Sequence, residues 1–168
     1  MRAIIYTSNT GSTAEYAQLL GNELNLPVHS LQQAKNKVPS GSEIIYLGWI
    51  MAGGIKGYKE AAKLYKVRAV CGVGMGQTGT QLKEVRDKNA IPQRIPLFTL
   101  QGNFDVKKLH GVYRFMMNVM VKTAGKGLAN KIDRTPEEDD MLDMMVNGGK
   151  RVFLQNLKAV TEWYKSLN

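Results

Sequence analysis

The sequence is poor in the side chains from which disulfides and metal sites are made. It has one cysteine and two histidines among 168 residues. A single cysteine forms no intramolecular disulfide, and Cys71 lies inside the apolar run VRAVCGVGM, which predicts a small buried hydrophobic residue. His29 and His110 are far apart and have no further ligand at a suitable spacing, so we expect no metal site. The low cysteine content indicates a reduced, cytoplasmic setting.

Long hydrophobic runs are also missing. No stretch approaches the roughly 18 apolar residues of a membrane-spanning helix, and the first residues, MRAIIYTS, lack the features of a secretory signal. Neither the G-x-S-x-G turn of serine hydrolases nor the Gly-Lys-Ser/Thr ending of a Walker loop occurs. We therefore expect no transmembrane helix, no serine nucleophile of that kind and no Walker-type nucleotide site.

Acidic residues are outnumbered. The chain has 14 aspartates and glutamates against 23 lysines and arginines, for a net charge of +9, and the excess is spread along its length. Such a charge favours anionic partners, whether phosphate, a lipid surface, nucleic acid or an acidic protein, and does not choose among them. Because the charge is scattered and no aromatic–basic motif accompanies it, a nucleic-acid-binding module is the least favoured of these classes.

Apolar, β-branched runs alternate with helical patterns along the chain, which is long enough for one domain. Five runs are predicted as strands, at residues 1–7, 27–31, 43–50, 67–74 and 95–102, and those at residues 1–7 and 43–50 are predicted to be buried. Helices are predicted at residues 13–24, 57–66, 79–88, about 105–124, 136–147 and 150–166. The alternation predicts an α/β fold, with a parallel sheet covered by helices on both faces.

The last two predicted helices carry specific signals. Thr135 is expected as the N-cap of the first of them, with Pro136 at its first position and Glu138 closing a capping box. The glycines after Asn147 are expected to end that helix. The final helix is expected to bury a stripe formed by Phe153, Leu157, Val160 and Tyr164.

The segment between the first predicted strand and helix is rich in hydrogen-bond donors. It consists of Ser8, Asn9, Thr10, Gly11, Ser12 and Thr13. Parallel α/β sheets bind ligands at the carboxyl ends of their strands, and the start of a helix offers unpaired N–H groups to an anion. Gly11 permits close approach of the backbone, and no lysine is present, so we expect an anion held by neutral donors. The alternative is that Thr10 or Ser12 merely caps the helix.

This segment resembles the FMN-phosphate loop of the flavodoxin family, in which hydroxyl residues occupy the first, third and sixth places around a fixed glycine. The resemblance extends over residues 1–168 through the order of strands and helices. It implies a single flavodoxin-like three-layer sandwich whose five parallel strands have the order 2-1-3-4-5. It also implies FMN as the cofactor, with residues 8–13 around its phosphate.

In flavodoxins, two further loops hold the isoalloxazine ring of FMN. Their counterparts follow the third and fourth predicted strands, and comprise Trp49, Ile50, Met51, Ala52, Gly53 and Gly54, and Gly74, Met75, Gly76, Gln77, Thr78 and Gly79. The resemblance implies that Trp49 or Met51 covers one ring face and that backbone groups near Gly76 and Gln77 meet the pyrimidine edge. Two alternatives are a core position for Trp49 and a dinucleotide fingerprint for the G-x-G-x-x-G of residues 74–79.

Residues 105–131 are more apolar and more basic than one sheet-packed helix requires. Between Val106 and Ile132 the chain has six lysines and arginines and no acidic residue. We predict a helical, basic insertion at residues 103–135. Its broad apolar surface suits a membrane interface, a partner groove or an apolar substrate that bears carboxylates. The alternative is a wide core stripe with a solvated basic edge.

Part of this insertion, residues 105–126, resembles the corresponding segment of quinone-linked protoporphyrinogen dehydrogenases. The residues that carry this resemblance are Tyr113, Arg114, Phe115, Met116, Met117, Lys122 and Gly125. That group consists of FMN-dependent, flavodoxin-fold enzymes of haem biosynthesis, and the resemblance implies an oxidoreductase that uses a quinone or a redox partner protein near the membrane. The alternative is a soluble flavodoxin that shuttles electrons between protein partners. No catalytic side chain is expected in either case, because the flavin performs the chemistry.

Overall fold

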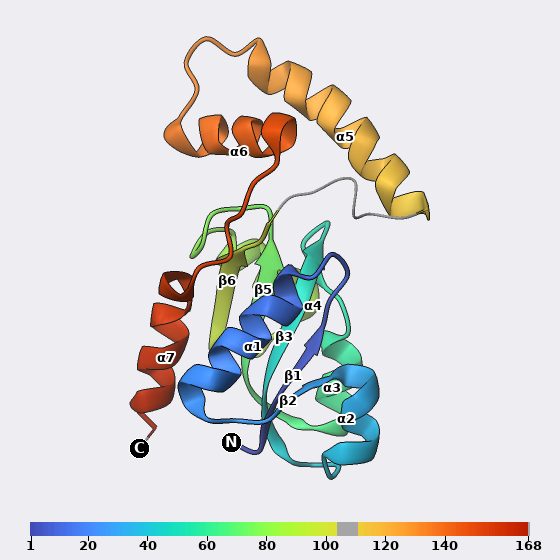
Figure 1. Cartoon of the computed structure of the whole chain (residues 1–168), viewed down its shortest axis with the longest axis vertical. Helices are drawn as coiled ribbons and strands as arrows, with labels where there is room; N and C mark the ends of the chain where they lie inside the picture. The colour runs from blue at the N-terminus through green and yellow to red at the C-terminus, as the bar shows by residue number, and fades with distance from the viewer. Residues whose placement is uncertain (104–110, 168) are drawn as a thin grey trace.

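The computed structural model describes residues 1–103 and 111–167, without the side chains of residues 111–114, 116, 117, 120 and 124. A parallel sheet lies between two layers of helices, which confirms the predicted α/β sandwich (Figure 1). The helices around the sheet are α1 (Ser12–Leu24), α2 (Leu31–Lys37), α3 (Tyr58–Leu64), α4 (Leu82–Asn89) and α7 (Lys158–Lys165). We call this part of the molecule the sandwich.

Five parallel strands form the body of the sheet. They are β1 (Ala3–Thr7), β2 (Val28–Ser30), β3 (Glu43–Met51), β5 (Lys66–Gly74) and β6 (Leu97–Gln101). Their spatial order is β2-β1-β3-β5-β6, which is the predicted order 2-1-3-4-5 when these five are counted along the chain. A short strand, β4 (Gly54–Ile55), adds to the predicted set and pairs antiparallel with the end of β3.

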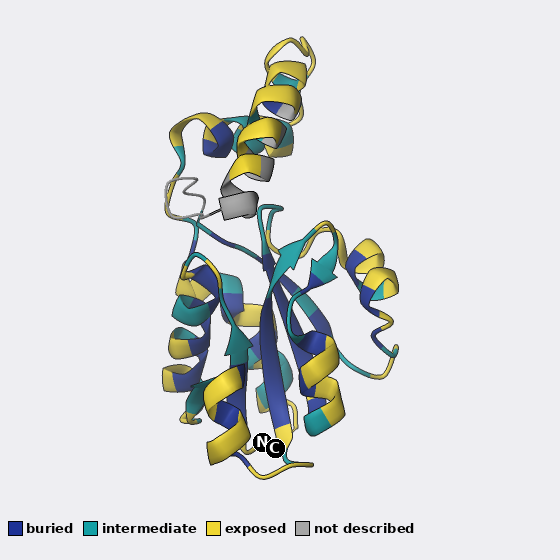
Figure 2. Ribbon diagram, turned by 90° about the vertical axis from the view of Figure 1, so that its right-hand side faces the viewer, coloured by how far each residue is buried: buried dark blue, intermediate teal, exposed yellow. Residues whose placement is uncertain are grey.

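Successive residues of the central strands serve opposite faces of the sheet. Ile5 and Tyr46 pack in the core beneath α2, α3 and α4, whereas Ile4 and Ile45 pack beneath α1 and α7. This two-sided burial explains why the strands are continuous apolar runs, and Figure 2 shows them buried between the helices. Cys71 lies in the second of these cores as predicted, and its burial raises the pKa of the thiol to about 12.

The prediction missed helix α2, since it extends the strand through Leu31 and assigns no helix to the residues that follow. The strand ends at Ser30, whose hydroxyl accepts a hydrogen bond from Gln33 N while Gln33 Oε1 accepts one from Ser30 N. This reciprocal pair is a capping box, and Leu31 therefore begins a helix. Leu31 and Ala34 pack this short helix on the sheet.

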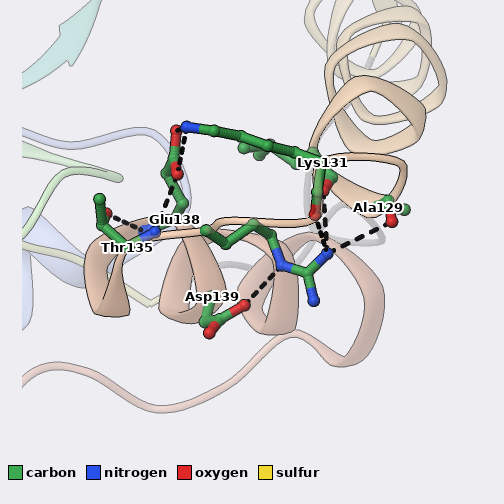
Figure 3. Close-up of polar contacts among 7 residues, drawn as sticks. Ala129, Lys131, Thr135, Glu138 and Asp139 are labelled. Carbon is green, nitrogen blue, oxygen red and sulfur yellow. Dashed lines mark hydrogen bonds and ion pairs between the residues drawn. The ribbon is translucent and has the colours of Figure 1, made fainter.

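Two further helices, α5 (Gly111–Ala129) and α6 (Pro136–Asn147), stand beyond the carboxyl ends of the strands (Figures 1 and 2). We call residues 111–147 the arm. Thr135 and Glu138 form the predicted capping box (Figure 3). Pro136 is at the first helical position, and the helix ends at Asn147 as predicted. The first residues of the predicted helix at 105–124 lie outside the described residues, and α5 continues beyond the predicted end.

The C-terminal helix departs from the prediction at its start. Residues 150–153 are not helical, and a 3-10 turn, η2 (Leu154–Leu157), precedes α7. Leu157 and Val160 are buried as expected, but Phe153 is 43% exposed because it lies before the helix and leaves the stripe. Among the described residues, no helix is long and apolar enough to cross a bilayer.

Candidate functional site

Three of the predicted segments meet at one edge of the sheet. They follow β1, β3 and β5, which are neighbours, and the pairs Thr7–Gly48 and Trp49–Val73 align the carboxyl ends of these strands. Figure 1 shows the three connections at the end of the sheet that faces the arm. Because open parallel sheets bind ligands outside the carboxyl ends of their strands, this edge is the candidate site.

The segment after β1 leaves the first turn of α1 without a side-chain cap. Gly11 is the N-cap, with φ 106° and ψ −28°, and no side chain accepts a hydrogen bond there. The alternative that Thr10 or Ser12 caps the helix is therefore wrong. Since the first N–H groups of an α-helix have no partner within the helix, those of Ser12, Thr13 and Ala14 can serve an anion.

The hydroxyl side chains of residues 8–13 are not all accessible to a ligand. Ser8 Oγ accepts a hydrogen bond from Gly11 N at 3.3 Å and is partly exposed, and Thr10 is partly exposed as well. Ser12 is 6% exposed, and its Oγ accepts a hydrogen bond from Asn103 N at 3.0 Å; Thr13 is 1% exposed. Ser12 and Thr13 thus offer a ligand mainly their backbone N–H groups, because their side chains are buried.

A buried tyrosine links the end of β1 to the chain that follows β4. Tyr46 donates its hydroxyl proton to the carbonyl of Lys56 at 2.7 Å and is hydrogen-bonded to Thr7 Oγ1 at 2.8 Å. The backbone of Gly57 lies against the hydroxyls of Tyr46 and Thr7. Gly57 has a φ of 78°, and a Cβ atom there would overlap both hydroxyl oxygens. Burial raises the pKa of Tyr46, so its hydroxyl stays neutral and keeps the carboxyl ends of β1 and β3 in fixed positions.

The second segment is a β-hairpin rather than the predicted loop. Strand β3 continues to Met51, and the two residues between β3 and β4, Ala52 and Gly53, have φ angles of 47° and 74°. Positive φ at both central positions matches the twist of a two-residue hairpin. Asn89 of α4 holds the hairpin: its Nδ2 donates to Gly53 O at 2.8 Å, and its Oδ1 accepts from Ile55 N at 2.7 Å.

The side chains of this hairpin have different surroundings. Ile50 packs on the core, and a Cβ atom at Gly72 would lie 2.8 Å from its Cδ1 atom. Trp49 is partly exposed, and Lys56 Nζ lies 5.7 Å from the centre of its ring. Ile50 therefore supports the sheet. The ring of Trp49 lies at the edge of the candidate site, with the positive charge of Lys56 beside it.

The third segment is anchored to β6. Gly79 N donates to Thr99 O at 3.0 Å, Gln101 N donates to Thr78 Oγ1 at 3.1 Å, and Gly102 N donates to Gly74 O at 2.7 Å. Helix α4 begins only at Leu82. The dinucleotide fingerprint requires the G-x-G-x-x-G to lead directly into a helix. Here the third glycine, Gly79, lies before the start of α4, so this requirement is not met. Met75, Gly76 and Gln77 are partly exposed between the anchored positions.

Two residues of the site region have no signal in the local sequence pattern. Asn89 lies at the end of a helix, and Asn103 follows β6, so neither belongs to a predicted loop. Each side chain makes hydrogen bonds to residues far away in the chain, such as Asn89 with Gly53 and Asn103 with Arg151. The donor-rich composition of residues 8–13 predicted one segment, but it could not identify what holds the segments together.

A cavity of about 610 Å³ lies at the opposite end of the sheet. Its walls come from α3, the starts of β5 and β6, and α7, and include Tyr58, Tyr65, Arg68, Arg94, Ile95 and Trp163. These residues all lie outside the three segments. Because they gather at the amino ends of the strands, the cavity is not where this architecture positions a ligand.

Comparison with known proteins adds one family. Residues 3–129 match the family model described as a flavodoxin domain. The match includes the three segments at the carboxyl edge and all of α5, and it ends before α6. No curated protein and no solved structure matches the chain.

Proposed function

This chain belongs to the flavodoxin domain family, which binds FMN and transfers electrons, and we propose that it is an FMN-dependent oxidoreductase with a substrate of its own. In this proposal, residues 8–13 hold the phosphate, and residues 49–53 and 74–79 lie around the isoalloxazine ring. FMN supplies the electron and hydride chemistry when it is bound. The chain supplies binding, orientation and electrostatics.

The donor set at the start of α1 supports the phosphate part of the proposal. The uncapped N–H groups of Ser12, Thr13 and Ala14 and the partly exposed hydroxyls of Ser8 and Thr10 are neutral donors, and the helix dipole favours an anion at this end. Glycine suits position 11 because of its φ of 106° and not for lack of space, because a Cβ atom there would lie more than 4 Å from the other described atoms that are not in its chain neighbours. A phosphate ester fits this set without a lysine.

The positive charge beside Trp49 supports the assignment of redox chemistry. A reduced flavin that has lost its N1 proton carries a negative charge, and a nearby cation stabilises it relative to the neutral oxidised form. Lys56 is such a cation, and the net charge of +9 acts in the same direction. We expect a two-electron midpoint potential above that of free FMN.

The arm is the observation that favours a substrate of its own. Its helices stand at the end of the sheet where the three segments meet (Figures 1 and 2), and α5 exposes Phe115 and Val119 beside Lys122 and Lys126. These four residues recur at spacings of four, three and four, so they share one face of the helix. An apolar and basic face near the cofactor suits a flat apolar molecule that carries carboxylates.

The narrower proposal is protoporphyrinogen as the substrate, with a quinone or a redox protein as the electron acceptor. It rests on the resemblance of residues 105–126 to quinone-linked protoporphyrinogen dehydrogenases, because the family model applies to flavodoxin domains at large. Of the residues that carry the resemblance, Tyr113, Arg114, Met116 and Met117 have side chains outside the described residues. Peripheral contact with a membrane through α5, in a cytoplasmic protein, belongs to the same proposal.

The first experiment records the visible spectrum of the purified protein after addition of FMN, and then measures protoporphyrinogen oxidation with a soluble quinone. Flavin bands that stay with the protein on gel filtration, together with quinone-dependent turnover, support the proposal. A Lys122→Ala, Lys126→Ala double variant should raise KM for the porphyrinogen and leave FMN binding unchanged. Failure to bind FMN would overturn the proposal as a whole.

The second candidate is a flavodoxin that shuttles electrons between protein partners. The match of the family model to residues 3–129 favours it, because that model describes a flavodoxin domain and names no substrate. Flavin that is bound and reduced by an acidic reductase, with one-to-one complex formation and no turnover of porphyrinogen or quinone, would replace the first proposal by this one.

A further inference from the structure

Asn103 joins two distant parts of the chain at the carboxyl end of β6. Its N–H donates to Ser12 Oγ at 3.0 Å, and its Nδ2 donates to Glu15 Oε2 at 3.2 Å, so it holds the first turn of α1. Its Oδ1 accepts hydrogen bonds from Arg151 N at 2.6 Å and from Val152 N at 3.0 Å. Asn103 therefore links the start of α1, which follows residues 8–11, to the segment that leads from α6 to the last helix.

The side chain of Arg151 continues this link into the arm. Its Nη2 lies 3.1 Å from Asp140 Oδ1 and 3.1 Å from Asp143 Oδ2, both on α6. The other carboxylate oxygen of Asp140 accepts a hydrogen bond from Gln101 Nε2 at 2.6 Å. The side chains of Arg151 and Asp140 are only 23% and 27% exposed, so this ion pair is partly shielded from water and salt.

Gln101 makes further contacts on both sides of this joint. Met144 lies one turn after Asp140 on α6 and is fully buried, and its Sδ lies 3.7 Å from Gln101 Nε2. Tyr16 of α1 donates its hydroxyl proton to Gln101 O at 2.7 Å and accepts from Asn156 Nδ2 at 2.6 Å. Gln101 is thus held from the arm on its side chain and from α1 on its carbonyl.

We propose that the position of the arm and the affinity for FMN are coupled through this joint, with Asn103, Gln101, Arg151 and Asp140 as positioning residues. The proposal rests on the proposed function, in which the first turn of α1 binds the FMN phosphate. Loss of the contact between Asp140 and Arg151 loosens the chain at Arg151 and Asn103, and then the turn that contains Ser12. By linkage, FMN bound at that turn stabilises the docked arm to the same extent.

The two neighbouring aspartates of α6 offer a matched test. Asp140 contacts Arg151 and Gln101 outside the arm, whereas Asp139 pairs with Arg134 inside it at 2.6 Å (Figure 3). Both changes to alanine remove one negative charge from the first half of α6. We expect the FMN dissociation constant to rise about five- to tenfold in Asp140→Ala and to stay within about twofold in Asp139→Ala.

The direction of the change separates coupling from simple electrostatics. Removing a carboxylate near a phosphate site should tighten phosphate binding by Coulomb's law, so weaker binding cannot come from the lost charge itself. Fluorescence titration of apoprotein with FMN measures the constant, and thermal unfolding of the apoproteins checks that the fold survives. Equal or tighter binding in Asp140→Ala would overturn the coupling while leaving the proposed function intact; a wild-type protein that binds no FMN would overturn both.

The reciprocal effect is measured without any change to the arm. Hydrogen exchange of the α6 amides should slow by about five- to tenfold when the wild-type protein is saturated with FMN. In Asn103→Ala, which breaks the joint at its middle, FMN should bind more weakly and should no longer slow exchange in α6. If FMN does not change the rate of hydrogen exchange in α6 of the wild-type protein, the coupling is contradicted.

Discussion

In the sandwich, aliphatic side chains such as Ile45 and Leu47 are fully buried between layers of helices, whereas the arm exposes Phe115, Ile132 and Val146 to 70%, 95% and 69%. The sandwich is held by the area that its sheet removes from water. The described contacts that fix the arm to it are fewer and largely polar, centred on Asp140, and Figure 2 shows the arm as mostly exposed. The sandwich thus supplies most of the stability, and the arm supplies an exposed surface that can contact other molecules.

Matched isoleucines test this contrast most strongly. Ile45→Ala removes a side chain that is 0% exposed and should lower the free energy of unfolding by about 2–5 kcal/mol. Ile132→Ala removes one that is 95% exposed and should change it by less than about 0.5 kcal/mol. Urea unfolding followed by circular dichroism measures both. A cost above 1 kcal/mol for the Ile132 variant (about the size that separates buried from surface changes) would mean that this side chain is buried in solution.

Matched glycines sharpen the comparison at the level of the backbone. Gly11→Ala forces a residue with a Cβ atom to φ 106°, so the phosphate turn should be strained by about 1–3 kcal/mol and the FMN dissociation constant should rise about tenfold. Gly127 lies inside α5 with open space around its Cβ position, and Gly127→Ala should stabilise the helix by about 0.5–1 kcal/mol. Unfolding curves and FMN titration of both variants check this. Unchanged FMN affinity in Gly11→Ala would remove residues 8–13 from the proposed phosphate site.

Matched lysines give the smallest expected effect. Lys56→Gln removes the cation beside Trp49 and should lower the two-electron midpoint potential of bound FMN by about 20 mV, equivalent to about 1 kcal/mol. Lys126→Gln changes the net charge equally, but in the arm, and should leave the potential within about 5 mV because solvent and salt screen it. Spectroelectrochemistry compares the two with the wild-type protein. Equal shifts in both variants would show that net charge, and not Lys56, sets the potential.

Features that depend on neighbouring residues were predictable. The capping box of Thr135 and Glu138 spans four consecutive residues, and the structure has it as predicted. The capping box of Ser30 and Gln33 carries the same local signal, but the helix that follows it, α2, was missed because residues 27–31 were interpreted as a strand that runs through Ser30. The predicted length of the last helix was wrong at its start, where Phe153 gave an apolar match outside the helix.

Features that depend on distant residues were not predictable. Asn103 lies 91 residues from Ser12, and Asn156 lies 140 residues from Tyr16, yet both pairs are hydrogen-bonded. An asparagine in a loop has the same local signature whether it holds two segments together or faces water. The hairpin at residues 49–55 is a similar case, because its form depends on Asn89 of another element.

The sequence by itself determined the α/β class and the donor-rich turn before α1, because hydrophobic periodicity and glycine positions act between close neighbours in the chain. The order of the five parallel strands followed only from the resemblance to flavodoxins, because strands pair with partners that are distant in the chain. Tertiary structure alone decided that the Ser12 hydroxyl is buried, that a hairpin follows β3, and that the arm is tied to the start of α1 through Asn103 and Arg151. Those contacts join residues that meet only after the sheet has formed, so no local pattern records them.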